Sequence, residues 1–101
     1  MNRSLEHIEY KADTEALAKY AKALSHPTRV AILKHLENQS CCFTGDLMDV
    51  FPLAQSTISQ HLKELKNAGL IQGELKPPKI KYCINQNNWQ AAKSLFQQFF
   101  E

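Results

Sequence analysis

Hydrophobic residues along the chain repeat at two different spacings, and the change of spacing divides the sequence. A spacing of three to four residues predicts helices over residues 14–24, 27–37, 45–50, 54–68 and 88–100. After Gly69 the spacing shortens to two, which predicts strands over residues 70–75 and 80–84, joined by a tip that contains two prolines. The run from Ser40 to Phe43 is too short for a helix and is expected to form a further short strand.

Capping residues locate several of the predicted helix ends. Thr14 and Thr44 carry side chains that can accept hydrogen bonds at helix N-termini, so each is expected to precede a helix. Pro27 suits the first position of the second helix, because this position does not need a backbone N–H group. Gly69 follows the helix over residues 54–68 and is expected to form a left-handed C-terminal cap.

The order of the predicted elements is typical of a winged helix-turn-helix. A short helix, a tight turn and a helix with a polar outward face make a helix-turn-helix over residues 44–68, and the hairpin over residues 70–84 is the wing. The predicted fold class is mainly α with a small β-sheet, with about five helices and a two-stranded wing. We expect a single domain over residues 1–101, in which residues 1–12 are loosely ordered.

Positive charge is concentrated in the part of the chain that contains this helix and hairpin. The net charge is only +2, yet residues 55–81 carry five lysines against two glutamates. The lysines are Lys63, Lys66, Lys76, Lys79 and Lys81. A local excess of this kind favours contact with a polyanion, although many charged runs are simply solvated faces.

The polar face of the helix over residues 54–68 carries groups that can read B-DNA. Its first two turns hold short side chains that can bond base edges in a major groove, or phosphates. These residues are Gln55, Ser56, Thr57, Ser59 and Gln60. An ordinary amphipathic surface helix would have a similar face, but the preceding short helix, the Gly69 cap and the basic hairpin together favour DNA. We therefore expect a sequence-specific protein whose partner is double-stranded DNA.

Two separated motifs resemble those of one family of regulators. Residues 23–33 read ALSHPTRVAIL, and residues 55–71 read QSTISQHLKELKNAGLI. In their order and spacing both runs resemble the ArsR-type (ArsR/SmtB) bacterial winged helix-turn-helix transcriptional regulators. The resemblance covers roughly residues 15–100 and implies a homodimeric repressor that releases operator DNA when a metal, a metalloid or a thiol-reactive signal reaches a sensing site.

The same resemblance implies particular contacts. The helices over residues 14–25 and 86–100 are expected to form the dimer, and His61 is expected on a DNA phosphate unless it is an ordinary exposed histidine. Two-fold pairing sets the recognition helices ~34 Å apart and predicts an approximately palindromic operator.

The chain departs from the family pattern at three places. Ala54 stands where relatives have a capping Ser or Thr, which should weaken the recognition helix by roughly 1 kcal/mol. Arsenic-sensing relatives have Cys-x-Cys directly before an Asp-Leu pair, whereas here the adjacent Cys41 and Cys42 lie further upstream of Asp46. The last helix lacks the Asp and His ligands of zinc-sensing relatives, so no zinc site is expected there.

The three cysteines remain as candidates for metal or thiol sensing. If Phe43 faces the core, Cys42 faces outward and shares a face with Cys83, while Cys41 points inward. Opposed thiols of this kind could hold As(III) or another thiophilic ion, or become oxidised, and Lys81 could lower a thiol pKa. In the alternative interpretation the cysteines are reduced, small apolar fillers of the core.

Other classes of function fit the sequence less well. The chain has no glycine-rich loop or carboxylate pair and no evident nucleophile with its base, so we expect no enzyme. The lack of a signal peptide, of a long apolar run and of an even cysteine framework predicts a cytoplasmic protein without a membrane span. Two alternatives to an induced repressor stay open: a winged-helix adaptor that binds proteins and not DNA, and an ArsR-type repressor that lacks a metal site.

Overall fold

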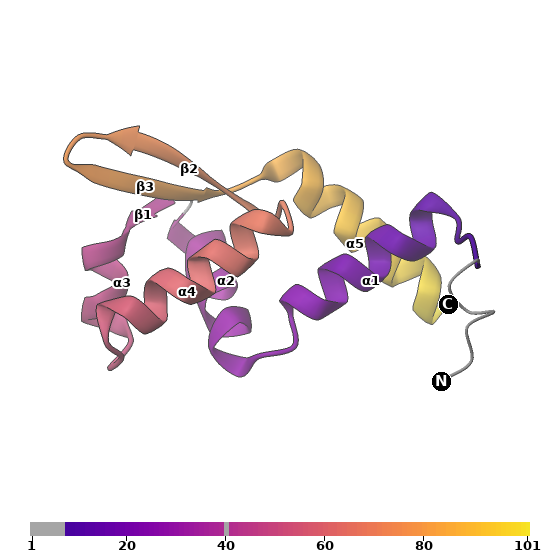
Figure 1. Cartoon of the computed structure of the whole chain (residues 1–101), viewed down its shortest axis with the longest axis horizontal. Coiled ribbons are helices and arrows are strands. Elements are labelled where there is room, and N and C mark those ends of the chain that lie inside the picture. Colours follow the sequence, from indigo (N-terminus) through magenta and orange to yellow (C-terminus); the bar gives the residue numbers. More distant parts are fainter. Residues whose placement is uncertain (1–7, 40) are drawn as a thin grey trace.

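The computed structural model describes residues 8–39 and 41–101, and its elements follow the predicted order (Figure 1). The helices of this part are α1 (Ala12–Ala23), α2 (Pro27–Gln39), α3 (Thr44–Val50), α4 (Gln55–Asn67) and α5 (Gln86–Phe100). The strands are β1 (Cys41–Phe43), β2 (Ile71–Lys76) and β3 (Lys79–Ile84). The prediction of a mainly helical winged helix-turn-helix with a small sheet is thus confirmed. The loose order expected for residues 1–12 falls largely outside the described residues, and Ala12 already begins α1.

The strands form one antiparallel sheet in the order β1-β3-β2. The β2–β3 hairpin is the wing, with Ile71 opposite Ile84 at its base and Lys76 opposite Lys79 at its tip. The two prolines lie between these lysines, as expected for residues that cannot donate to a strand ladder. The short β1 pairs with the other edge of β3 and runs directly into α3, so the sheet connects the wing to the helix-turn-helix.

Several helices begin earlier than their capping residues predicted. Helix α1 has Lys11 at its N-cap, so Thr14 lies inside the first turn. Helix α3 begins at Thr44, and the Asp46 carboxylate accepts a hydrogen bond from the Phe43 N–H over 3.1 Å. An acidic side chain in the first turn therefore bonds back to the N–H of the residue before the helix, in place of the expected cap by Thr44. Helix α5 begins two residues early because the Asn85 side chain caps it, accepting from the Asn88 N–H over 3.2 Å.

The C-terminal cap of α4 forms as expected. Gly69 has a φ of +86°, in the left-handed region that favours glycine. Its N–H donates to the Lys66 carbonyl over 2.9 Å, and the Leu70 N–H donates to the Leu65 carbonyl over 3.1 Å. These are the two hydrogen bonds of a Schellman motif, which turns the chain sharply from α4 into the wing.

One hydrophobic core holds the helix-turn-helix against the sheet. Helix α4 contributes a fully buried stripe, Ile58, Leu62 and Leu65, which fixes the outward direction of its polar residues. The other fully buried large side chains come from α2, α3 and the start of the wing: Ile32, Leu33, Leu36, Leu47, Leu70 and Ile71.

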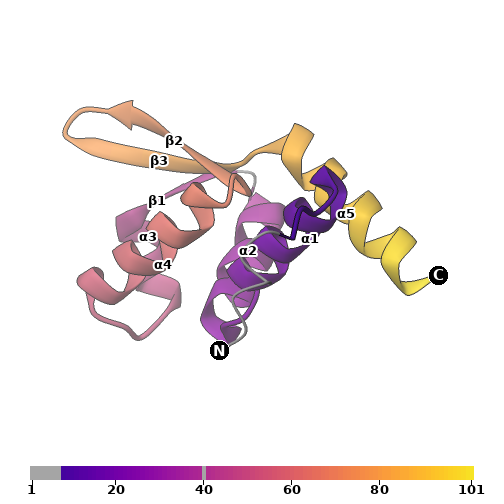
Figure 2. The ribbon, with the colours of Figure 1, turned by 45° about the vertical axis from the view of Figure 1, so that its right-hand side comes forward.

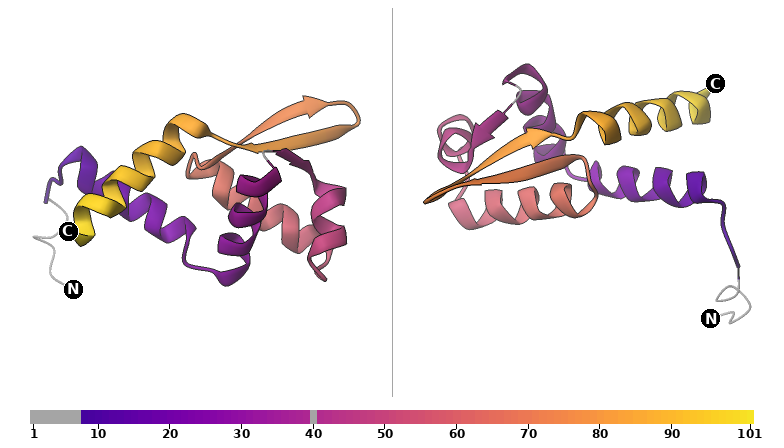
Figure 3. Two further views of the ribbon diagram at one scale, coloured as in Figure 1. Left: turned by 180° about the vertical axis from the view of Figure 1, so that it is seen from behind. Right: turned by 90° about the horizontal axis from the view of Figure 1, so that it is seen from above.

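The remaining two helices extend from this core, to which they contribute Tyr20, Ala23 and Ala92. Helices α1 and α5 lie side by side at one end, while α3, α4 and the wing occupy the other end (Figures 1 and 2). Views from behind and from above show the same separation (Figure 3). The protein is elongated, with principal extents of 47 × 31 × 24 Å.

Candidate nucleic-acid interface

Helix α4 presents its polar residues to solvent. Its buried stripe lies on one side, so the remaining positions project outward along the other. The exposed residues are Gln55, Ser56, Thr57, Ser59, Gln60, Lys63, Lys66 and Asn67. The N-cap residue Ala54 makes no side-chain hydrogen bond, in agreement with the weak cap expected from the sequence.

A hollow joins the start of α4 to the wing. It encloses about 340 Å³ and is lined by Gln55 and Ser59 of α4, and by Lys79 and Tyr82 of β3. Phe43 and the first turn of α3, including Asp46, close its remaining side. Side chains of α4 and β3 that lie 20 to 27 positions apart in the sequence thus share one concave surface, where two of the predicted recognition residues, Gln55 and Ser59, meet the wing.

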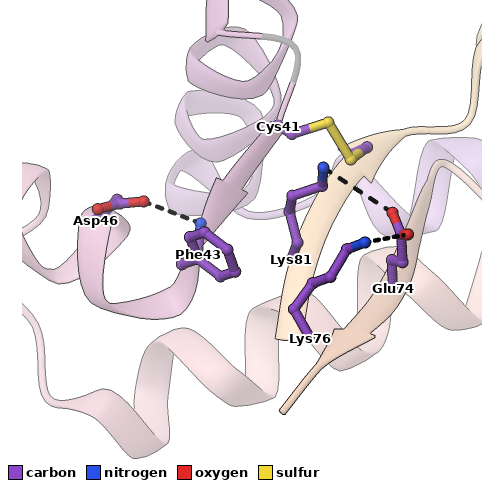
Figure 4. The surroundings of a disulfide bond; sticks show 7 residues. Cys41, Phe43, Asp46, Glu74, Lys76 and Lys81 are labelled. Atoms are coloured by element: carbon purple, nitrogen blue, oxygen red, sulfur yellow. Dashed lines mark hydrogen bonds and ion pairs between the residues drawn. A yellow bond between two sulfur atoms is a disulfide. The ribbon is translucent and has the colours of Figure 1, made fainter. Parts of the chain in front are cut away.

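The wing lysines differ in how much free charge they offer. Glu74 binds Lys76 with a 3.0 Å ion pair and lies 3.9 Å from Lys81 (Figure 4). The hydrogen bond and charge of Lys76, with a smaller contribution from Lys81, lower the pKa of Glu74. Lys79 instead lies over the Phe43 ring, with Nζ 5.5 Å from its centroid. Lys79 and the exposed lysines of α4 therefore carry positive charge outside this Glu74 cluster.

His61 points away from the polar face of its helix. Its side chain is only 8% exposed, and Arg29 Nε donates a hydrogen bond to His61 Nδ1 over 3.2 Å. The His26 ring lies 4.4 Å from the His61 ring, centroid to centroid. Burial, followed by the charges of His26 and Arg29, lowers the pKa of His61. The orientation expected from the resemblance, toward a DNA phosphate, is therefore not found in the free chain.

Arg29 and His26 are residues that the sequence interpretation missed as partners of α4. Both lie in the first of the two motifs, at the start of α2, whereas His61 lies in the second. The spacing of the buried residues along α4 could have indicated that His61 faces inward. Ile58, His61, Leu62 and Leu65 follow the i, i+3, i+4, i+7 pattern of a buried helix face, so His61 occupies a core position.

The cysteine arrangement predicted from the sequence is wrong by one residue. Cys41 lies opposite Cys83, with 4.2 Å between their Cα atoms, and the two form a disulfide (Figure 4). Cys42 lies opposite Tyr82 and is buried at 7% exposure, while Phe43 is half-buried. Cys42, and not Phe43, is therefore the residue of β1 that packs in the core. Because side chains alternate along a strand, an error of one position reverses the predicted direction of every side chain in it.

The chemistry of the thiols changes accordingly. Cys42 is the free thiol of the described residues, and its pKa is raised by burial and then by the Asp46 carboxylate. The expected activation by Lys81 therefore does not apply to Cys42. Within residues 8–39 and 41–101, no group of three or more His, Cys, Asp or Glu side chains is placed to hold a metal ion. In the same residues, no helix combines the length and the apolar character that crossing a membrane requires.

Comparison with known proteins identifies the family. Residues 26–72, which contain the helix-turn-helix, match the family described as "Bacterial regulatory protein, arsR family". The HTH-type transcriptional regulator YgaV of Escherichia coli K12 is 34% identical over 79 residues, which cover 78% of this chain and 80% of YgaV. The HTH-type transcriptional repressor SmtB of Mycobacterium tuberculosis is 38% identical over 69% of this chain, and the match spans about half of SmtB (51%).

Solved structures agree with the fold. An ArsR-like transcriptional regulator from Rhodococcus sp. RHA1 superposes with a TM-score of 0.76 over 88% of this chain and 83% of the other, at 22% identity. The likeness of fold, the matching helix-turn-helix and the identity to YgaV all agree. This chain belongs to the arsR family, whose members are DNA-binding transcriptional regulators and not enzymes.

Proposed function

We propose that this chain is a cytoplasmic, homodimeric repressor that binds an approximately palindromic operator through α4 and the wing. The observation that carries the proposal is the shared hollow, where Gln55 and Ser59 face Lys79 and Tyr82. A B-DNA major groove is ≈ 12 Å wide and admits one α-helix, so the wing then lies along the neighbouring backbone.

The exposed residues divide into two roles by their chemistry. Gln55, Ser59 and Gln60 can exchange hydrogen bonds with base edges and so supply sequence preference. Ser56 and Thr57, near the start of α4, suit phosphate together with the first N–H groups of the helix. The lysines attract the phosphates without regard to sequence: Lys63, Lys66 and Lys79 with free charge, and Lys76 and Lys81 with charge that Glu74 partly neutralises.

The proposed dimer forms through α1 and α5. Phe99 and Phe100, at the end of α5, are 66% and 77% exposed in the single chain, and Leu17 and Leu95 near them are only half-buried. Helix α1 and the C-terminal part of α5, which carry these side chains, lie at the opposite end of the molecule from the wing, so pairing there leaves the α4 surface open (Figure 1). A two-fold axis at that end would present two copies of α4 to successive turns of one DNA face.

Fluorescence anisotropy with duplex DNA from upstream of the chain's own gene tests the proposal. We expect tight binding that a scrambled duplex does not displace, with a steep loss of affinity as salt increases. The combined substitutions Gln55→Ala, Ser59→Ala and Lys63→Ala should abolish the preference for that duplex. Lys34→Ala is the matched control, because Lys34 is exposed on α2 and is not among the proposed contacts. Unchanged binding by the triple variant would reject DNA reading by α4 and favour the protein-binding adaptor.

We further propose that an oxidant relieves repression through Cys41 and Cys83. The two thiols each lose a proton and together give up two electrons as the S–S bond forms, and a peroxide that accepts them becomes two water molecules. The bond ties β1, which leads into α3, to the central strand of the sheet. Because α3 and the wing must both adjust to the duplex, a covalent bond between β1 and β3 restricts that adjustment and weakens binding.

As(III) is the other inducer that these residues suggest. Cys42 faces the core, so at most Cys41 and Cys83 could share a thiophilic ion, and their sulfur atoms are bonded to each other in this structure. The bonded pair therefore fits an oxidant better than a thiophilic ion, which would need both sulfur atoms as free thiolates.

The inducer is tested on the protein–operator complex of the reduced chain. Hydrogen peroxide should release the DNA, dithiothreitol should restore binding, and both Cys41→Ser and Cys83→Ser should remove the response. Cys42→Ala is the control and should respond as the parent chain does. Release of the DNA by arsenite but not by peroxide would show that the inducer is a metalloid and not an oxidant. If neither compound releases the DNA, the chain is a repressor that does not respond through these cysteines.

A further inference from the structure

The contact between His61 and the start of α2 joins the recognition helix to the rest of the domain. Arg29 donates from Nε to His61 Nδ1 over 3.2 Å, and the His26 ring packs against the His61 ring. The His26 Nδ1 atom in turn accepts from the Thr28 N–H over 3.0 Å, which fixes the corner between α1 and α2. Among the described residues, His61 is the buried polar side chain, and it connects α4 to α2 by a hydrogen bond.

This hydrogen bond exists in only one protonation state of His61. Because Nδ1 accepts from Arg29, the neutral ring carries its proton on Nε2. Adding a second proton places it on Nδ1, which removes the acceptor and brings two positive charges together. A protonated His61 therefore cannot keep this contact with Arg29.

The groups around the ring offer little compensation for such a charge. On the α2 side the neighbours are Arg29 and His26, and the helix begins there at Pro27, so its positive end is also close. Arg29 borders a hollow of about 160 Å³ that Lys19 and Lys22 of α1 also line, with Glu64 of α4. Glu64 is the carboxylate of that hollow and faces three basic side chains.

Carboxylates on the other elements packed against α4 are engaged elsewhere. Asp46 of α3 lines the hollow beside the wing and accepts from the Phe43 N–H. Glu74 of β2 is paired with Lys76 and lies near Lys81.

We propose that His61 is a positioning residue that makes operator binding proton-sensitive. Neutral His61 holds α4 against the start of α2 in the orientation that reads DNA, and protonated His61 releases this contact. Specific affinity then falls as the solution becomes acidic. The inference rests on the proposed role of α4 as the recognition helix. Burial, His26 and Arg29 all lower the pKa of His61, so the ring stays neutral near neutral pH and changes charge only on acidification.

The test compares operator affinity between about pH 7.5 and about pH 5 in the parent chain and in His61→Gln. Glutamine offers a side-chain oxygen that can accept from Arg29 and cannot be protonated in this range. If binding DNA requires neutral His61, affinity falls about tenfold for each pH unit below the pKa that His61 has in the free chain. We expect this fall in the parent chain and a much flatter profile, with affinity retained near neutral pH, in His61→Gln.

His35→Gln is the matched control, because His35 lies on α2 with its ring against Phe51 and away from this contact. It should keep the fall of the parent chain. The same fall in His61→Gln as in the parent chain would overturn the inference.

A measurement without DNA separates this inference from the proposed function. In the free chain, NMR can follow the titration of the His61 ring together with the hydrogen exchange of the α4 amides. The protection of the α4 amides, taken relative to the intrinsic exchange rate at each pH, should decrease as His61 gains its proton, whereas unchanged protection through that titration would overturn the inference. Failure of the parent chain to bind its upstream duplex at any pH would reject the proposed function, and the measurement on the free chain would still decide the role of His61.

Discussion

Asn88, in the first turn of α5, donates a hydrogen bond from Nδ2 to the carbonyl oxygen of Gly69 over 2.8 Å. Gly69 follows α4, the proposed recognition helix, and α5 belongs to the proposed dimer, so this bond joins the two proposed functional regions of the domain. The closeness of Asn88 and the local backbone angle together explain why glycine occupies position 69. A Cβ atom built on Gly69 would lie 2.9 Å from Asn88 Nδ2, and the φ of +86° is unfavourable for any side chain.

Gly69→Ala should therefore lower the free energy of unfolding by about 1–2 kcal/mol, the usual cost of holding a residue with a Cβ in the left-handed region. Urea denaturation followed by circular dichroism measures the change. Gly45→Ala is the matched control, because nothing lies within 4 Å of its added Cβ and it sits inside α3, where alanine is favoured over glycine. Equal losses in the two variants would contradict this account of Gly69.

Ala54→Ser should stabilise the chain. Ala54 holds the N-cap of α4 with extended backbone angles and no side-chain hydrogen bond, and a serine there can bond a free N–H of the first turn. The expected gain is about 1 kcal/mol, visible as a higher urea midpoint at constant slope. Ala91→Ser, on the exposed side of α5 away from a helix end, should show no gain. A midpoint for Ala54→Ser that equals that of the parent chain would show that the cap is already satisfied.

The stability of the chain should fall on the acid side of neutrality. The folded-state pKa of His61 lies below its ordinary value of 6.5, so the unfolded chain binds more protons between these two values. The contribution of His61 is therefore complete above about 6.5, decreases as the pH falls, and levels off below the folded-state pKa. Thermal melts across this range should show a shallower fall for His61→Gln than for the parent chain. Equal slopes would mean that His61 does not have a lowered pKa.

Cys42 should react slowly with iodoacetamide. Its burial and its raised pKa both reduce the exposed thiolate, which is the reacting species. After mild reduction Cys41 and Cys83, which are half-buried, should be labelled before Cys42. Peptide mass spectrometry after timed labelling measures the order. Labelling of Cys42 first would place it outside the core.

Phe99→Glu should weaken the proposed dimer without unfolding the chain. The Phe99 side chain is 66% exposed, so charge at this position costs little within one copy but is costly in an apolar interface. Sedimentation velocity should show a shift from dimer to monomer at micromolar concentration. Val50→Glu, at an exposed apolar position in α3, is the control and should leave the dimer intact. Dimers of equal strength in both variants would place the interface elsewhere.

The fold could be predicted from the sequence because its signals are local. The Gly69 cap, the buried stripe of α4 and the change of hydrophobic spacing after the cap all depend on neighbouring residues, and the structure has each of them. The first residues of the helices were predicted less well. The side chains of Asp46 and Asn85 bond the free N–H groups there, and nothing in the sequence distinguishes them from similar side chains nearby.

The cysteines and His61 show what local pattern cannot supply. In a strand of three residues, nothing in the sequence decides whether Cys42 or Phe43 enters the core, and that decision sets which cysteine meets Cys83. The resemblance to a family predicted that His61 faces the DNA, whereas its spacing from Ile58 and Leu65 is that of a buried residue, which is what the structure shows. Its partner Arg29 lies 32 positions away and becomes visible only when α2 and α4 pack together.

The separation of the α1–α5 pair from the proposed reading surface gives the proposed dimer a long lever arm. In a dimer joined at that end, each reading surface lies near the tip of a body 47 Å long. A tilt of about 5° at the joint moves such a tip by about 4 Å, close to the ~3.4 Å that separates neighbouring base pairs along a strand. A rotation small enough to leave the joint intact is thus large enough to take both copies of α4 out of step with the DNA helix.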